Sequence, residues 1–240
     1  MYLASANVLL IPALDWRHVR PAAKPPGRKP APRLPSALGW MLAQLRERAA
    51  HATVGMFGES LTRWPDLAHR VIDAGCELAA MTWDAVDPWA MPAGALSDQV
   101  AQTIAAAKDL GLRAPTTFLP PLPVNQILDP PRIAALREAG IMRLAGCRGA
   151  GFPAVLLAEW AGLPLTGALI RVLPVILTRS ALARQPGAAC AVSPLDIDPG
   201  APGHAFGRTR AMRRFPHLLQ RGFITAAEAE AISLKGPHQK

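Results

Sequence analysis

The sequence predicts an α/β protein in which parallel strands alternate with crossover helices, and three observations support this prediction. Short apolar or β-branched runs alternate with longer segments that have a helical period. Glycine follows two of the helical segments, where a left-handed residue commonly ends a helix. The length of 240 residues suits a single core, because barrels and α/β domains commonly contain roughly 200–250 residues. We therefore expect one domain over residues 1–240.

The predicted strands are short. The apolar run near the N-terminus lacks the preceding basic residues and the cleavage site of a secretion signal, so we interpret it as the first strand. The strands are expected at Val8–Ala13, Thr53–Phe57, Glu77–Met81, Leu112–Ala114, Met142–Ala145 and, as the last, Ala189–Val192.

The predicted helices have apolar residues at helical spacing. Ser36 is a candidate cap for the first helix, which runs to about Ala50. Gly75 and Gly140 each follow a predicted helix. Further helices are expected at Arg63–Ala74, Pro92–Asp109, Pro131–Ala139 and Leu169–Ala183, with Pro174 inside the last, and a helical extension is expected at about 206–235.

The charge is strongly positive. The net charge of +9 favours polyanions such as acidic polysaccharide, lipid phosphate or nucleic acid, without choosing among them. Residues 20–35 are rich in Pro, Lys and Arg and have no apolar face, which predicts an extended basic loop. Because the sequence has no helix-turn-helix, zinc finger or interleaved aromatic–basic strand, we predict no specific nucleic-acid partner.

The cysteines and the apolar segments indicate in which compartment of the cell we expect the protein. Cys76, Cys147 and Cys190 are odd in number and far apart, which argues against a disulfide framework and favours the reducing cytoplasm. The apolar stretch 152–177 is interrupted by charges and prolines, and it falls short of the continuous span of about 20 residues that a bilayer requires. We predict a protein that is not transmembrane, with peripheral contact at the inner membrane left open.

The stretch GESLTRWPDLAHRVIDAGCELAAMTWD, Gly58 to Asp84, resembles the polysaccharide deacetylase family, in which such a helix leads through Ala-Gly-His-Glu into a strand ending in a histidine motif. The flanks agree in order: a strand reaching Asp15, an Arg-Ala-Pro at residues 113–115, and the segment Ser193–Pro199. The tail from Leu163 to Pro199 looks most like the branch associated with exosortase and exopolysaccharide gene clusters. The resemblance implies a distorted (β/α) barrel with about seven strands.

The resemblance also implies where the chemistry of the family would take place. Its members remove an acetyl group from N-acetylated sugars with water bound to a divalent metal, held by an acidic residue and two histidines. Arg17 falls at the acidic position, and Met81 and Ala85 fall at the histidine positions, so no ligand of that set is present. Ser193 replaces the general-acid histidine, Leu195 replaces the following tryptophan, and a hydroxyl cannot replace imidazole as an acid near neutral pH.

Two catalytic positions retain the residue that the resemblance implies. Asp15 corresponds to the base aspartate, and Arg113 corresponds to the arginine that orients it. We expect these vestigial residues to pair, and we expect Arg17 to fill the metal position and contact Asp15. The predicted remnant is closed and charge-compensated.

The loops that follow the strands are expected to converge on one mouth, because the carboxyl ends of parallel strands lie together. Trp83 and Trp89 flank the degenerate motif, where aromatic rings either stack on a sugar or pack in the core. Cys76 is expected to be a buried, inert thiol. The predicted pocket residues are Arg17, His18, Met81, Trp83, Asp84, Pro115, Thr116, Ser193 and Leu195.

Three hypotheses about function follow. The first is a deacetylase-like protein without metal-dependent hydrolysis or cofactor, which binds a carbohydrate, an anionic glycolipid or a protein partner in exopolysaccharide metabolism. The second is an active carbohydrate N-deacetylase with a rebuilt site, in which Asp15, His18 and Asp84 bind zinc. The third, a binder of polyanions or nucleic acid, rests on charge alone.

Overall fold

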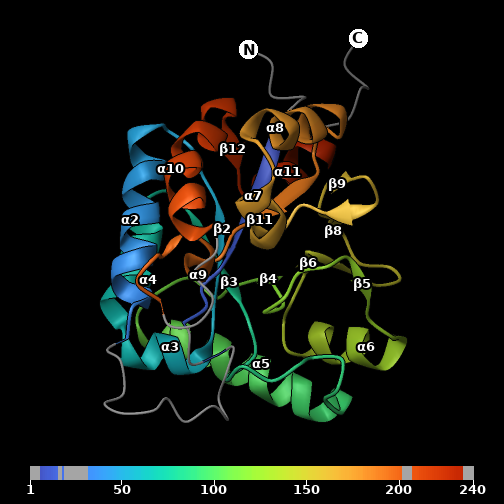
Figure 1. Ribbon diagram of the computed structural model, residues 1–240. Coiled ribbons are helices and arrows are strands. Elements are labelled where there is room, and N and C mark those ends of the chain that lie inside the picture. Colours follow the sequence, from blue (N-terminus) through green and yellow to red (C-terminus); the bar gives the residue numbers. More distant parts are fainter. Residues whose placement is uncertain (1–5, 16–17, 19–31, 202–206, 235–240) are drawn as a thin grey trace.

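The computed structural model describes residues 6–15, 18, 32–201 and 207–234 of the chain. Seven parallel strands, in the order β11-β1-β2-β3-β4-β6-β8, form a nearly closed barrel (Figure 1). A backbone bridge from Leu157 to Ala189 brings the end of this series back to its start. The strands are β1 Asn7–Pro12, β2 Thr53–Met56, β3 Glu77–Ala80, β4 Thr117–Phe118, β6 Arg143–Ala145, β8 Ala154–Val155 and β11 Ala189–Ala191.

Helices surround the strands (Figure 1). They are α2 Leu34–Glu47, α3 Gly58–Arg63, α4 Pro65–Asp73, α5 Ala93–Asp109, α6 Pro130–Glu138, α7 Gly167–Val172, α8 Val175–Arg184, α9 Pro194–Ile197, α10 Arg208–Leu218 and α11 Ala226–Leu234. Three short pairings complete the fold: β5 Gln126–Ile127 with β7 Cys147–Arg148, β9 Glu159–Trp160 with β10 Leu163–Pro164, and β12 Phe223–Ile224 with the start of β1. None of the helices in the described part of the chain is long and apolar enough to cross a membrane.

The core has two layers because successive strand residues point to opposite faces. Val8 and Leu10 of β1 belong to a cluster inside the barrel, which small alanines of β3, β6 and β11 keep narrow. Leu9 and Ile11 face outward and pack against the helices. The leucine and methionine stripe predicted for α2 is buried in this outer layer. The predicted α/β alternation and the distorted barrel with about seven strands are confirmed.

One predicted strand is wrong. Residues 112–114 do not pair in the sheet, and β4 lies at Thr117–Phe118 instead. The backbone N–H of Leu112 bonds to the carbonyl of Ala107 at the end of α5, so Leu112 completes the end of a helix. Leu112 and Ala114 pack against the helix-side clusters, which explains why their apolar spacing imitates a strand.

Several helix boundaries also differ from the prediction. The helix predicted at 63–74 corresponds to α4, which begins at Pro65, while Arg63 is the last residue of a separate helix, α3. Ser36 lies inside α2, where its hydroxyl donates to the carbonyl of Arg33, so it is not the cap. Pro174 divides the segment 169–183 into α7 and α8. The helix ends at Gly75 and Gly140 are as predicted, with φ of +72° and +93°.

The C-terminal segment is helical as predicted, but it also contributes a strand. Phe223–Ile224 pairs with β1, so β11 is not the last strand. Helix α11 follows at once, and Ala226 and Ala229 pack into the cluster inside the barrel. The predicted basic loop at 20–35 lies mostly outside the described residues, and its last two residues begin α2.

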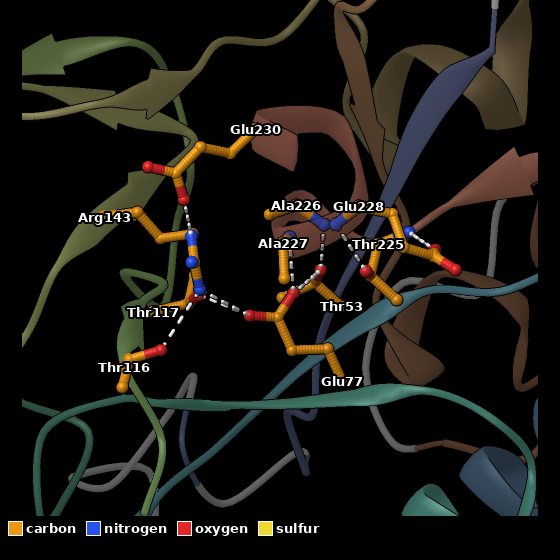
Figure 2. Close-up of polar contacts among 10 residues, drawn as sticks. All are labelled: Thr53, Glu77, Thr116, Thr117, Arg143, Thr225, Ala226, Ala227, Glu228 and Glu230. Carbon is orange, nitrogen blue, oxygen red and sulfur yellow. Dashed lines mark hydrogen bonds and ion pairs between the residues drawn. The ribbon is translucent and has the colours of Figure 1, made fainter. Parts of the chain in front are cut away.

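A buried polar network closes the end of the barrel at which the strands begin (Figure 2). One carboxylate oxygen of Glu77 accepts hydrogen bonds from the Thr53 hydroxyl at 2.8 Å and the Ala227 N–H at 3.1 Å. The other oxygen accepts from Thr117 and from Arg143, at 3.4 Å for Arg143. The network thus joins β2, β3, β4 and β6 to the first turn of α11.

Arg143 and the start of α11 complete this network. The Arg143 guanidinium donates to Glu230 at 2.7 Å and to the Thr116 hydroxyl at 3.1 Å. The Ala226 N–H donates to the Thr53 hydroxyl at 2.7 Å. The first N–H groups of a helix have no partner within the helix, and here Thr53 supplies one. In a barrel of this kind, polar groups at this end serve stability rather than catalysis.

We predict that Glu77→Ala lowers the free energy of unfolding by about 3 kcal/mol or more, because the Thr53 and Thr117 hydroxyls and the Ala227 N–H lose their shared acceptor together. The Glu77 and Arg143 side chains are only 14% and 15% exposed, so water cannot readily replace the lost contacts. Urea denaturation measures the change. Glu138→Ala on the exposed side of α6 is the control, and an equal loss in both variants would contradict the role of the network.

We predict that the first turn of α11 makes the stability of the fold depend on pH. Burial alone would raise the pKa of Glu228, but hydrogen bonds from Thr225 and the contact with His51 hold this pKa below the ordinary value of 4.5. Ionised Glu228 therefore stabilises the fold fully above pH 4.5, and this contribution is lost as pH falls through the lowered pKa. Thermal unfolding of Glu228→Gln should depend less on pH below 4.5 than that of the wild type. Parallel curves for the two proteins would contradict this assignment.

Candidate binding site at the barrel mouth

Asp15 follows β1 and is buried, with 1% of its surface exposed. Its Oδ2 accepts the backbone N–H groups of Arg33 at 3.0 Å and Leu34 at 3.1 Å. These amides stand at the N-terminus of α2, where a carboxylate is favourable because the unpaired N–H groups carry partial positive charge. Asp15 therefore anchors α2 to the end of β1. Arg17, the predicted partner of Asp15, lies outside the described residues.

An apolar cluster occupies the centre of the mouth. Met81, fully buried at the end of β3, packs with Leu14 and Phe57, while Ala85 and Leu195 cover the cluster. Three of these are positions that the family resemblance assigns to two metal ligands and to the tryptophan of the late-strand motif. The structure brings Met81, Ala85 and Leu195 together in a packed hydrophobic plug.

His18 lies against this plug. Its ring centroid is 4.5 Å from that of Phe57, and its Nδ1 accepts the Asp15 backbone N–H at 2.9 Å. Asp84 stands across a small cavity from it, and Asp84 Oδ1 is buried without a hydrogen-bond partner among the described residues.

The donors at the mouth do not fit a hydrolytic metal ion. Such an ion requires about three nitrogen or oxygen ligands and an open position. Within the described ranges, no three His, Cys, Asp or Glu side chains are grouped to hold one ion, and Asp15, His18 and Asp84 form no such group. The thioether of Met81 is a soft ligand with little affinity for a hard ion.

Ser193 caps a short helix. Its hydroxyl accepts the Leu195 N–H at 3.2 Å, and its own N–H donates to Asp196 Oδ2 at 2.9 Å, which together make a capping box for α9. Beyond α9, Asp198 forms a two-bond ion pair with Arg33, with Arg33 Nη2 to Asp198 Oδ1 at 2.8 Å. This hydrogen-bonded pair raises the pKa of Arg33 and ties the start of α2 to α9.

Three predicted site residues lie at the opposite end of the barrel. Arg113 is exposed and precedes β4, so it cannot follow a strand into the mouth. Pro115 is buried, and Thr116 contacts Arg143 in the network at the strand starts. The family resemblance predicts the pairing of Arg113 with Asp15, but Asp15 follows β1 at the mouth whereas Arg113 precedes β4 at the other end of the barrel. The residues that follow β4 at the mouth are apolar, beginning with buried Leu119 and Pro120.

The two tryptophans have different environments. Trp83 is partly buried and packs on α3 so closely that a Cβ at Gly58 would lie 2.2 Å from its ring. Trp89 is partly exposed, and its indole N–H donates to the Ile127 carbonyl at 3.0 Å, which fixes the orientation of the ring. Of the pair, only Trp89 lines a mouth pocket.

Three pockets surround the plug. The polar pocket, of about 210 Å³, is lined by His18, Glu59, Ser60, Arg63, Trp64, Asp84, Ala85 and Val86. The aromatic pocket, also of about 210 Å³, is lined by Leu14, His18, Ala85, Val86, Asp87, Pro88, Trp89, Pro121 and Leu122. The basic pocket, of about 340 Å³, lies between the 121–124 segment, α7 and the ends of β1 and β11, and it contains Arg171 and Arg208.

Sequence reasoning missed Arg33, Arg171 and Arg208. Arg33 and Arg208 flank segments that lie outside the described residues, and Arg171 sits in an apolar stretch. No local motif distinguishes these arginines from the others in a basic chain. Only the meeting of α2, α7 and α10 at the mouth identifies them.

The three cysteines are buried and unpaired, as predicted. Burial raises the pKa of Cys76 to about 11 and that of Cys190 to about 12, and it raises the pKa of Cys147 as well. None lines one of the three mouth pockets.

The fold class is a barrel of parallel strands, and the candidate site lies in the pockets at the ends of these strands. Residues 35–137 match the model of the polysaccharide deacetylase family. The match and the fold both support this family. A comparison with curated protein sequences finds no match.

Solved structures share the fold over nearly the whole chain. A peptidoglycan deacetylase from Bacillus subtilis is 11% identical, with a TM-score of 0.60 and coverage of 97% of this chain and 93% of that one. A family 4 carbohydrate esterase from Streptomyces lividans, in complex with acetate, is 13% identical, with a TM-score of 0.55 and coverage of 94% and 90%. A CE4 family pseudoenzyme from Bacillus anthracis is 11% identical, with a TM-score of 0.58 and coverage of 95% and 66%. At such identities the likeness concerns the fold, and function must be argued from the site.

Because only the thiolate reacts, we predict that iodoacetamide at pH 8 labels Cys76 far more slowly in the folded protein than in denaturant. A pKa near 11, against 9.0 for an ordinary cysteine, lowers the thiolate fraction about a hundredfold at that pH, and burial adds to the effect. Mass spectrometry of peptides measures labelling at each cysteine, with glutathione as the reactivity control. Rapid labelling of the folded protein would contradict the inert assignment.

Proposed function

We propose that the chain is a polysaccharide deacetylase-like protein that does not carry out metal-dependent deacetylation and that binds carbohydrate at the barrel mouth. The observation that carries the proposal is the plug of Leu14, Phe57, Met81, Ala85 and Leu195 at the centre of the mouth. A metal and its water would have to occupy a region that apolar side chains fill, and a cation among such groups is strongly disfavoured. The aspartate retained after β1 supports the same conclusion, because its Oδ2 is engaged by α2.

The aromatic pocket supports carbohydrate as the ligand class. Sugar rings have apolar faces and polar edges, so they suit sites with an aromatic or aliphatic wall and a few fixed polar groups. Trp89 supplies a ring with fixed orientation, Leu122 supplies an aliphatic surface that is 66% exposed, and His18 and Asp87 supply polar atoms.

A solved structure and a sequence resemblance give two further lines of support for this proposal. The Bacillus anthracis neighbour is a pseudoenzyme of the CE4 family, and a mutant of it has restored enzymatic activity. Loss of activity with retention of the barrel is therefore compatible with this fold. The resemblance of the tail at Leu163–Pro199 to an exosortase-associated branch supports a role in exopolysaccharide metabolism, with a protein partner in assembly as a further element of the proposal.

We predict that the protein binds N-acetylglucosamine oligomers without releasing acetate, with or without added zinc or cobalt. Calorimetry measures binding, and an acetate assay measures turnover. Trp89→Ala should weaken binding about tenfold, since an aromatic ring contact contributes about 0.5–1.5 kcal/mol beyond the area that it buries. Trp89→Phe, which keeps a ring, is the matched control and should retain most of the affinity. Metal-dependent acetate release by the wild type would overturn the proposal and favour the active deacetylase.

A second prediction tests whether the plug occupies the position that the family resemblance assigns to a metal site. The triple variant Arg17→Glu, Met81→His and Ala85→His should bind one zinc ion per chain, because it restores one acidic and two imidazole ligands. Calorimetry measures the affinity, and the double variant lacking Met81→His is the control that keeps one ligand fewer. A folded triple variant that binds no zinc would contradict the assignment of these positions.

A further inference from the structure

Two arginines from different helices meet in the basic pocket. Arg171 comes from α7 and Arg208 from the first turn of α10. The helices pack closely here, since a Cβ at Gly207 would lie 3.0 Å from Cβ and 3.1 Å from the carbonyl oxygen of Arg171. The fold therefore brings two guanidinium groups to the same wall of the mouth.

Arg208 has an unused donor. The residue is 8% exposed, and one guanidinium nitrogen donates to the Ala201 carbonyl at 2.7 Å. Its Nε is buried and has no hydrogen-bond partner among the described residues. Burial, followed by repulsion from Arg171, lowers the pKa of Arg208. A buried charged donor without a partner is costly, and an anionic acceptor would remove this cost.

The charges in the pocket do not balance. Asp196 is the one acidic residue of its lining, and its Oδ1 lies 3.6 Å from Arg171 Nε. The other oxygen of Asp196 accepts the Ser193 N–H. Asp198, the next acidic group, forms its ion pair with Arg33. Two guanidinium groups thus share one carboxylate in the described lining, which leaves one positive charge.

Another part of the lining is apolar. Leu14, Pro121, Leu122 and Val124 line it, and Leu122 and Val124 are 66% and 45% exposed. A ligand for this pocket therefore needs a negative group at one end and an apolar surface at the other. The volume of about 340 Å³ admits a molecule of the size of one or two sugar rings.

We propose that the basic pocket binds the carboxylate of an acidic sugar, with a hexuronate as the ligand class. The carboxylate would lie between Arg171 and Arg208, because the planar guanidinium fork matches carboxylate geometry, and the sugar face would pack on Leu122 and Pro121. The choice of a sugar rests on the proposed function, whereas the choice of an anion rests on the two arginines. The site would make the protein selective for anionic polysaccharide.

The test is calorimetric titration of the full chain with sodium D-glucuronate, D-glucose and sodium acetate at constant ionic strength. Glucuronate should bind, glucose should show no measurable binding, and acetate should bind at least about tenfold more weakly, because it lacks the ring that contacts the apolar wall. Arg208→Gln and Arg171→Gln should each weaken glucuronate binding about tenfold or more. Arg210→Gln is the matched control, since it removes the same charge from an exposed position of α10.

Circular dichroism verifies that each variant is folded, and Arg171→Gln alone decides the question if Arg208→Gln is not. Equal loss in the Arg210 and Arg171 variants would overturn the proposal, because it would show attraction by net charge alone. Equal affinity for acetate and glucuronate would overturn the sugar assignment. Failure of the proposed function is distinguishable, because it would appear as no binding of neutral N-acetylglucosamine oligomers by the wild type, whereas glucuronate binding is measured separately. Trp89→Ala should weaken oligomer binding about tenfold while glucuronate affinity stays unchanged.

Discussion

The Glu77 carboxylate is the contact on which the barrel depends most. Four parallel strands and the last helix meet around it, and each of its oxygens accepts more than one hydrogen bond. Parallel strands joined by long crossovers need a constraint that holds their ends together, and here a buried ion and its threonine partners supply that constraint. Because this network closes one end, the loops at the other end are left for binding.

The mouth is held by a different set of contacts. Asp15 binds the N-terminus of α2, and Arg33 in turn binds Asp198 beyond α9, so the first and the late strands are joined across the rim. A carboxylate that the family resemblance implies is a base thus acts as a fixed anchor for a helix. The apolar plug lies at the same mouth, and Met81 is fully buried within it.

The pockets around the plug differ in the chemistry of their linings. The aromatic pocket presents Trp89 and aliphatic residues, and the basic pocket presents two arginines that share one carboxylate. The shape of the mouth comes from loops that the barrel positions.

The sequence by itself determined the alternation of strands and helices, the buried stripe of α2 and the helix ends at the two glycines. These features are local, because periodicity, turn chemistry and residue identity can be read within one segment. Tertiary structure alone decided that Arg113 lies at the far end, that Asp15 binds a helix terminus, and that Arg171 and Arg208 share a pocket. The strand at 112–114 failed because apolar residues that pack against helices have the same spacing as a strand. Contacts between segments distant in the sequence arise only when the barrel closes, so they cannot be predicted from any single stretch of the chain.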